Sequence, residues 1–260
     1  MEFFLSVLDE LMEYMGGFVS SHKRQLFEKI VPDRTHYLQV VLSEVDDPLD
    51  ANAAFRSCEC FGIQNVHWIQ GDSGSKMSRG VSVGATKWLD LEIYQAEAFA
   101  DCQTKLRHAG LQQFALSTRP GSVPVDLLPL DRPLALWFAS ETGGFRSAVE
   151  AQMDGFVHLP MMGFGRHFNF SVAVALTLQK VKSRLEREGH CWQMNPEERV
   201  NLLLGLYATV PKSRRQIVSR FLEMKGLHWQ DLVPEVRSSK FWQLVGSAEG
   251  SQVVLGSALG

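Results

Sequence analysis

The stretch that decides the fold is FVHLPMMGFGRHFNFSVAVALTLQK, residues 156–180. Its first four residues, 156–159, form an apolar run that is stopped by Pro160, which is typical of a buried β-strand. The run SVAVALTL, residues 171–178, consists of small and apolar residues and suits a helix that is buried on most sides. The stretch therefore predicts a strand followed by a helix.

The loop between these two segments is rich in polar groups. It contains Gly163 and Gly165, followed by Arg166, His167 and Asn169. A strand, a glycine loop and a helix that opens near Asn169 form a cradle for a small ligand. Taken alone, the stretch is more typical of an ordinary strand-to-helix turn.

Strand-like and helix-like segments alternate before this stretch. Strands are predicted at residues 36–42, 65–69, 89–94, 113–117 and 134–138, and helices at residues 50–60, 96–108 and 147–153. This alternation predicts an α/β fold with a largely parallel sheet and helices on both faces. Ligand sites in such sheets gather at the carboxyl ends of the strands, which points to the loops after Ser117, Phe138 and Leu159.

The two ends of the chain differ from this central region. Amphipathic helical patterns occupy residues 2–16 and 21–30 before it, and residues 196–206 and 211–225 after it. We therefore predict an N-terminal helical extension (1–34), a central α/β domain (35–187) and a C-terminal helical extension (188–260).

Composition excludes several classes of protein. The 260 residues are 45% hydrophobic and 21% charged, as in an ordinary globular protein, and no apolar run approaches the ~20 residues of a membrane span. The four cysteines are too few and too scattered for a disulfide scaffold, so we expect a cytoplasmic protein. Cys58 and Cys60 lack the further ligands of a tetrahedral site, so we expect no metal and interpret them as buried apolar residues.

The net charge of −3 is unusual for a protein that binds a polyanion. Binding RNA requires only a local basic surface, because the attraction depends on charges near the phosphates. Candidate basic clusters, each of which could equally be a solvated helix face, are 23–24, 166–167, 180–187 and 212–220.

Three segments resemble, in order, the signature motifs of the SpoU branch of the SPOUT RNA methyltransferases. DANAAFR (50–56), followed by FG (61–62), is similar to the family pattern N-x-x-A-x-x-R with its later F-G. LWFASETGG (136–144) is similar to V-x-G-x-E-x-x-G. LPMMG with FNFSVAVAL (159–176) resembles I-P-M-x-G with L-N-V-S-V-A. Three ordered motifs are far more specific than one, and the nearest form is the SpoU/TrmH-type tRNA ribose methylase.

The resemblance implies a parallel-sheet SPOUT fold with a C-terminal trefoil knot, and a homodimer. It implies S-adenosyl-L-methionine as the cofactor and transfer of its methyl group to a ribose 2′-hydroxyl of RNA, most closely a guanosine of the tRNA D-loop (guanosine-18 type). Another tRNA position or rRNA is the alternative substrate. A non-catalytic RNA-binding homodimer is the rival from another class. A nucleotide-binding dehydrogenase is disfavoured because no G-x-G-x-x-G follows the first strand.

The resemblance also assigns roles to single residues. Those implied as catalytic are Arg56, Glu141 and Asn169. Those implied to bind the cofactor, mainly through their backbone, are Ser117, Ala139, Leu159 and Phe168. Those implied to contact substrate RNA are Asp50, Arg166 and His167. A guanidinium stays protonated and is a poor base, so we interpret Arg56 as a bidentate phosphate anchor whose charge favours ionisation of the hydroxyl.

The chain departs from the family pattern at four positions. Asp50 replaces an asparagine and Ala139 replaces a glycine, while His167 and Phe168 replace a serine and a leucine. Asp50 adds negative charge at a site meant for RNA, and His167 could stack on a base or contact a phosphate. These departures leave the target nucleotide open.

Overall fold

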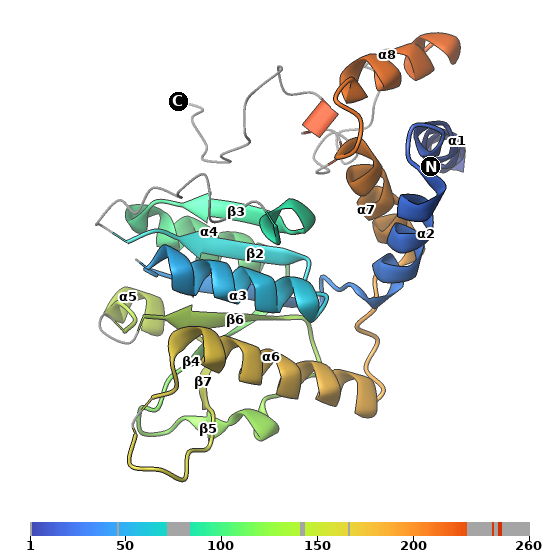
Figure 1. Cartoon of the computed structure of the whole chain (residues 1–260). Coiled ribbons are helices and arrows are strands. Elements are labelled where there is room, and N and C mark those ends of the chain that lie inside the picture. Colours follow the sequence, from blue (N-terminus) through green and yellow to red (C-terminus); the bar gives the residue numbers. More distant parts are fainter. Residues whose placement is uncertain are drawn as a thin grey trace. The chain divides into compact units, whose positions relative to one another are not determined.

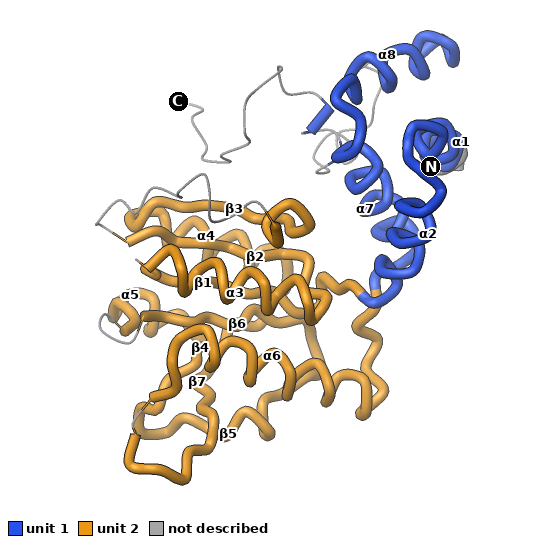
Figure 2. The backbone as a smooth tube through the Cα atoms, viewed as in Figure 1, with its two compact units in different colours: residues 1–33, 194–254 blue, residues 34–193, 255–260 orange. Residues whose placement is uncertain are grey.

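The structure is a computed structural model of the whole chain. The residues that it describes are 2–45, 47–71, 84–140, 144–165, 167–227, 241 and 244–245. The described residues divide into two compact units (Figure 2): the larger contains those within 34–193, and the smaller contains those within 1–33 and 194–254.

The larger unit is built on a sheet of seven strands in which all neighbours are parallel, in the order β3-β2-β1-β6-β4-β7-β5 (Figure 1). The strands are β1 (Leu38–Ser43), β2 (Asn65–Ile69), β3 (Asp90–Tyr94), β4 (Gln112–Leu116), β5 (Val123–Pro124), β6 (Leu134–Ala139) and β7 (Gly155–His158). The predicted parallel α/β fold is confirmed. The two-residue strand β5 was not predicted, because it is too short to show a periodic pattern.

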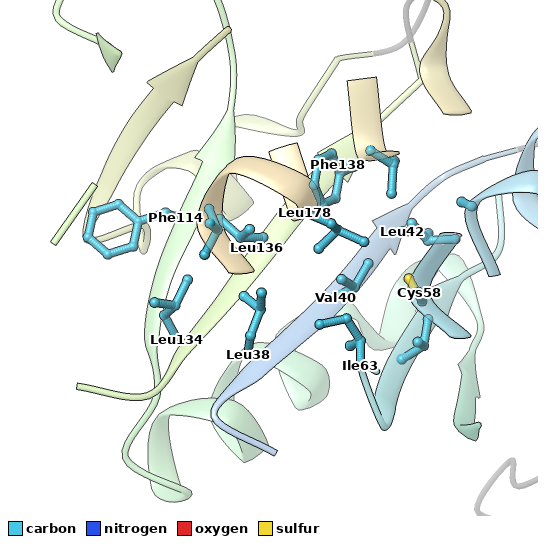
Figure 3. Packing of buried hydrophobic residues seen from close by; sticks show 14 of the residues in the cluster. Leu38, Val40, Leu42, Cys58, Ile63, Phe114, Leu134, Leu136, Phe138 and Leu178 are labelled. Carbon is cyan, nitrogen blue, oxygen red and sulfur yellow. The ribbon is translucent and has the colours of Figure 1, made fainter. Parts of the chain in front are cut away.

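Helices cover both faces of the sheet. On one face α3 (Pro48–Cys60) and α6 (Phe170–Arg187) pack on strand residues such as Val40 and Leu136 (Figure 3). On the other face lie α4 (Phe99–His108) and the short α5 (Ser147–Glu150). Because β1 and β6 are buried on both sides, their sequences are almost continuously apolar rather than alternating.

Within the described ranges, four short 3₁₀ segments lie between the longer elements: η1 (Val31–Asp33), η2 (Thr86–Trp88), η3 (Ala96–Ala98) and η4 (Val125–Leu127). The helix predicted at 96–108 is thus divided between η3 and α4, and the one predicted at 147–153 ends at Glu150.

Side-chain caps start both helices that carry the sequence motifs. The Asp47 carboxylate accepts a hydrogen bond of 2.8 Å from the backbone N–H of Leu49, and Pro48 occupies the first turn of α3. The Asn169 Oδ1 accepts from the backbone N–H of Ser171 at 3.1 Å and from that of Val172 at 3.4 Å, which starts α6.

Helix α6 is buried on one face only, which corrects the expectation of burial on most sides. Val174 and Leu178 are fully buried, whereas Val172 is 45% exposed and Leu176 is 39% exposed. The helical period of 3.6 residues places the two exposed side chains opposite the buried ones.

The smaller unit contains α1 (Glu2–Gly16), α2 (Ser21–Ile30), α7 (Pro196–Ala208) and α8 (Arg214–Met224). Helix α1 packs on α7 and α8, and α2 packs on α7, so helices from the two ends of the chain share one core. Helix α7 begins with a capping box in which Asn195 and Glu198 bond each other's backbone N–H groups. No helix among the described residues is long and apolar enough to cross a membrane.

The cysteines only partly match their interpretation as buried apolar residues. Cys58 is buried in the core beneath α3, but Cys60 is exposed. Two positions along a helix differ in direction by about 200°, so both side chains cannot face the sheet.

Candidate functional site

A cavity of about 200 Å³ lies at the carboxyl ends of β4, β6 and β7. It is lined by Leu116, Ser117, Thr118, Phe138, Ala139, Ser140, Gly144, Phe145, Glu150, His158, Leu159, Met161, His167, Phe168, Phe170 and Ala173. Parallel strands expose their carboxyl ends at one edge of the sheet, so loops far apart in sequence meet there.

The four residues predicted to bind a cofactor all line this cavity. Ser117 follows β4, Ala139 ends β6, Leu159 follows β7, and Phe168 precedes α6. They come from three places along the chain, because Leu159 and Phe168 share the loop between β7 and α6, and the sheet brings these places together. His167, predicted to contact RNA, lines the same cavity and is exposed.

The cavity combines an apolar wall with polar groups at its margins. Leu116, Phe138 and Phe170 provide flat, apolar surface, while hydroxyl groups and two histidines provide hydrogen-bonding groups. Such a wall suits a planar heteroaromatic ring, and the margins suit the hydroxyls of an attached sugar. A nucleoside-like cofactor therefore fits this combination of an apolar wall and polar margins.

Hydrogen bonds hold the backbone around the cavity in place. The Ser117 N–H donates to the Val157 carbonyl at 2.8 Å, which ties the loop after β4 to β7. The Gly144 N–H donates to the Ser140 carbonyl at 3.1 Å, and Gly144 has a φ of 60°. A positive φ favours glycine, which accounts for Gly144 at this turn.

An ion pair stabilises one wall of the cavity. An Arg119 Nη1–H donates to the Glu150 Oε2 at 3.0 Å, and the Arg119 guanidinium lies 4.3 Å from the centre of the Phe156 ring. His158 Nδ1 lies 3.0 Å from the Ser122 Oγ, within hydrogen-bonding distance. These contacts connect α5, β7 and the loop after β4.

A second ion pair joins the loop after β1 to the start of α5. Glu44, which directly follows β1, has a φ of 54°, and its carboxylate pairs with the guanidinium of Arg146 at the N-cap of α5. A positive φ is uncommon for a residue with a side chain and is found more often at functional sites. The pair connects the loop that leads to Asp50 with the loop that carries the second motif.

Arg56 and Asp50 lie on α3 and do not line the cavity. Arg56 is exposed, and a Cβ atom on Gly84 would lie 3.3 Å from its Nη2 atom, so the glycine leaves room for the guanidinium. Asp50 sits in the first turn of α3, where a negative charge is favoured by the helix dipole.

The remaining predicted residues have different outcomes. Asn169 lies at the rim as the N-cap of α6 and is not a cavity-lining residue. Glu141 and Arg166 fall outside the described residues. No group of three or more metal-ligating side chains occurs in the described part of the chain.

Sequence reasoning missed four polar residues of the cavity. Thr118, Ser140 and His158 are neighbours of predicted residues at strand ends, and the carboxyl-end rule could have found them. Glu150 carries no such signal, because it reaches the cavity only through the placement of α5 against the loop after β4.

A polar cluster apart from the cavity, here called the β2–β3 cluster, consists of Gln39, His67, Glu92, Tyr94 and Lys105. His67 Nε2 lies 2.9 Å from the Gln39 Oε1, and Glu92 accepts hydrogen bonds from Tyr94 and Lys105, both at 2.5 Å. Burial lowers the pKa of His67 to about 4, so its imidazole is neutral at pH 7.

The fold and the cavity define a class of protein: the chain belongs to the SpoU rRNA Methylase family, whose sequence model matches residues 37–179. Among curated relatives, the tRNA (guanosine(18)-2′-O)-methyltransferase of Borreliella burgdorferi is 29% identical over 208 residues, covering 79% of this chain and 94% of the relative. The enzyme of the same name from Thermus thermophilus is 26% identical over 169 residues, covering 64% of this chain and 85% of the relative.

Solved structures agree on the fold. The A. aeolicus TrmH/SpoU tRNA modifying enzyme superposes with a TM-score of 0.64 at 19% identity, covering 72% of this chain and 96% of that chain. The SpoU methyltransferase AviRb from Streptomyces viridochromogenes superposes with a TM-score of 0.52 at 19% identity, covering 62% of this chain and 64% of that chain.

Proposed function

We propose that this protein is an S-adenosylmethionine-dependent RNA 2′-O-ribose methyltransferase that acts on a guanosine of the tRNA D-loop, of the guanosine-18 type. The observation that carries the proposal is that Ser117 after β4, Ala139 at the end of β6, and Leu159 and Phe168 in the loop between β7 and α6 line one cavity. The names of the Borreliella and Thermus relatives support the choice of tRNA and of this guanosine.

The cavity would hold the cofactor through its apolar wall and through backbone groups at the ends of β4, β6 and β7. When bound, S-adenosylmethionine supplies a methyl group that is already activated by its sulfonium, so the chemistry needs no metal. The protein then has to orient the ribose hydroxyl, exclude water and stabilise negative charge on the attacking oxygen.

We assign to Arg56 the stabilisation of negative charge on the attacking oxygen. Its guanidinium is exposed on α3, stays protonated, and presents two N–H groups that can bind a phosphate in bidentate fashion. A phosphate held in this way positions the neighbouring ribose, and one of its oxygens can accept the hydroxyl proton. Arg166 and His167 stay proposed RNA-contacting residues, as the family resemblance implies, and Asp50 influences which nucleotide is accepted.

We assign Asn169 a narrower role than the sequence indicated. Its Oδ1 is already engaged by the backbone N–H groups of Ser171 and Val172 and by the Ser171 hydroxyl at 2.7 Å. The side-chain NH₂ group remains to donate to substrate. Glu141 stays a proposed catalytic residue, as the resemblance of the second motif implies.

We further propose a cytoplasmic homodimer whose β7–α6 region forms the family's trefoil knot. Val172 and Leu176 on α6 are partly exposed, and Met162 and Phe164 before it are fully exposed. Soluble proteins seldom leave such apolar groups uncovered, and a second copy of this chain is the occupant that the family implies.

The test is transfer of labelled methyl groups from S-adenosylmethionine to unmodified tRNA and, separately, to rRNA. Wild type should label tRNA ribose, and Arg56→Ala should lower kcat/KM by roughly a thousandfold, the scale of losing an arginine that stabilises transition-state charge. Arg56→Lys should recover little, because an ammonium cannot make the bidentate contact. Arg132→Ala, at an exposed position before β6 and outside the cavity lining, is the matched control.

Three results would contradict parts of the proposal. Near-normal turnover by Arg56→Lys would exclude the bidentate anchor. Label in rRNA alone would show that the substrate is rRNA and not tRNA. Binding of RNA without any transfer would favour the non-catalytic dimer, in which Asp50 and His167 would be the residues to revert to asparagine and serine.

A further inference from the structure

The charges around the cofactor cavity are unevenly distributed. Among the described residues that line the cavity, Glu150 is the only one with a carboxylate, and none is a lysine or an arginine. The guanidinium that pairs with Glu150, on Arg119, is not a lining residue. A ligand in the cavity is therefore closer to the negative member of this ion pair than to the positive one.

We infer that Glu150 makes the cavity selective for the methylated, positively charged form of the cofactor over the demethylated product, an inference that rests on the proposed function. At neutral pH S-adenosylmethionine carries a sulfonium, an ammonium and a carboxylate, and its net charge is therefore +1. Loss of the methyl group turns the sulfonium into a neutral thioether and leaves S-adenosylhomocysteine with a net charge of zero. A carboxylate on the cavity wall attracts the first species more strongly than the second.

The position of the Glu150 carboxylate is fixed from several directions. It is held by the Arg119 guanidinium at 3.0 Å, and that guanidinium in turn packs over the Phe156 ring. Two further hydrogen bonds attach α5 and the residues just after it to α4: from Gln103 to the Val149 carbonyl at 3.0 Å and from Arg107 to the Gln152 carbonyl at 2.6 Å.

This selectivity has a use in the catalytic cycle. Because methyl transfer removes the charge that Glu150 attracts, the product is held less firmly than the donor, and the enzyme exchanges one for the other more easily. The Glu150 side chain is 32% exposed, so the attraction is screened by solvent and by salt. We expect a preference of roughly tenfold, at the lower end of what a charged cleft contributes.

The test is calorimetric titration of the full chain with S-adenosylmethionine and with S-adenosylhomocysteine, in the absence of RNA. Glu150→Gln should raise the Kd for the charged cofactor roughly tenfold and change the Kd for the neutral product less than about twofold. Glu97→Gln, an exposed residue outside the cavity lining, removes the same charge and should leave both Kd values unchanged.

A second measurement does not depend on the variant folding. Raising the ionic strength from about 0.05 to about 0.5 M should weaken wild-type binding of the charged cofactor more than that of the product. Equal weakening of both ligands, by the substitution or by salt, would overturn the inference while leaving the proposed function intact. Failure of wild type to bind either ligand would instead overturn the proposed function.

Discussion

The cavity and the β2–β3 cluster both gather polar and titratable side chains within the same sheet, yet they differ in what surrounds them. The cavity lies where strands end and loops begin, and His167 on its margin is exposed. The β2–β3 cluster lies within the strands, and His67 is only 2% exposed. The strongly lowered pKa of His67 occurs in the second region, where burial is the main cause and outweighs the opposing charge of Glu92.

This difference shows that a perturbed pKa indicates burial and does not by itself indicate a functional site. Shifted titratable groups are useful pointers to active sites only when they also face a ligand-sized space. We expect the β2–β3 cluster to contribute to stability and the cavity to contribute to binding, so substitutions should separate the two.

The largest effect is expected from blocking the cavity. Ala139→Trp places an indole ring at the end of β6, where the apolar wall would otherwise contact a ligand, and should abolish measurable binding of S-adenosylmethionine. The thermal midpoint should change little, because Ala139 is only half-buried. Calorimetry and circular dichroism measure the two quantities.

Ala109→Trp, at the exposed end of α4, is the matched control and should bind the cofactor normally. Normal cofactor binding by Ala139→Trp would show that the cofactor occupies another site. The cavity would then no longer differ from the β2–β3 cluster as the region that binds the cofactor.

An intermediate effect is expected from pH. The pKa of His67 is about 4 in the folded protein and 6.5 ordinarily, so between these values the unfolded chain takes up a proton that the folded chain does not. The free energy of unfolding should therefore fall by about 1.4 kcal/mol per pH unit below pH 6.5, or about 3 kcal/mol in all.

Urea unfolding at several pH values tests this linkage. His67→Gln removes the titrating group and should flatten the dependence between pH 6.5 and about 4, while His108→Gln, at an exposed position, should retain it. Cofactor affinity at pH 7 should be the same in both variants. An unchanged slope in His67→Gln would assign the acid sensitivity to other groups.

The smallest effect is expected at Asn169, which belongs to the rim of the cavity. Asn169→Ala removes the cap of α6 and should lower stability by about 1 kcal/mol. Asn169→Asp keeps the accepting oxygen and loses the NH₂ donor, so it should retain stability but transfer methyl groups more slowly.

Denaturant midpoints together with kcat on tRNA separate the two contributions of Asn169. Full activity of Asn169→Asp would restrict this residue to capping, and a loss of stability equal to that of Asn169→Ala would show that the cap depends on the amide.

Local pattern was sufficient for most of the fold and for part of the site. The apolar runs and helical periods in the central region predict strands and helices close to the observed ones, because burial imposes its period directly on the sequence. The resemblance to the family also selected Ser117, Ala139, Leu159 and Phe168 as candidate cofactor-binding residues, each at the end of a strand or just before a helix.

Other features required contacts between distant parts of the chain. No local sequence pattern predicts the order of the strands, in which β6 lies beside β1. The reason is that parallel neighbours are joined by long crossovers. The exposed face of α6 and the exposure of Cys60 follow from which side of each helix meets the sheet.

The sequence by itself determined the class of this protein: a parallel α/β sheet, three ordered motifs and a set of residues for a nucleoside-like cofactor. Only the tertiary structure decided that those residues share one cavity, that Glu150 joins them while Arg56 stays outside on α3, and that helices from both ends form one unit. The physical reason is that local patterns record burial, whereas the approach of a side chain to a site is set by packing between segments far apart in the chain.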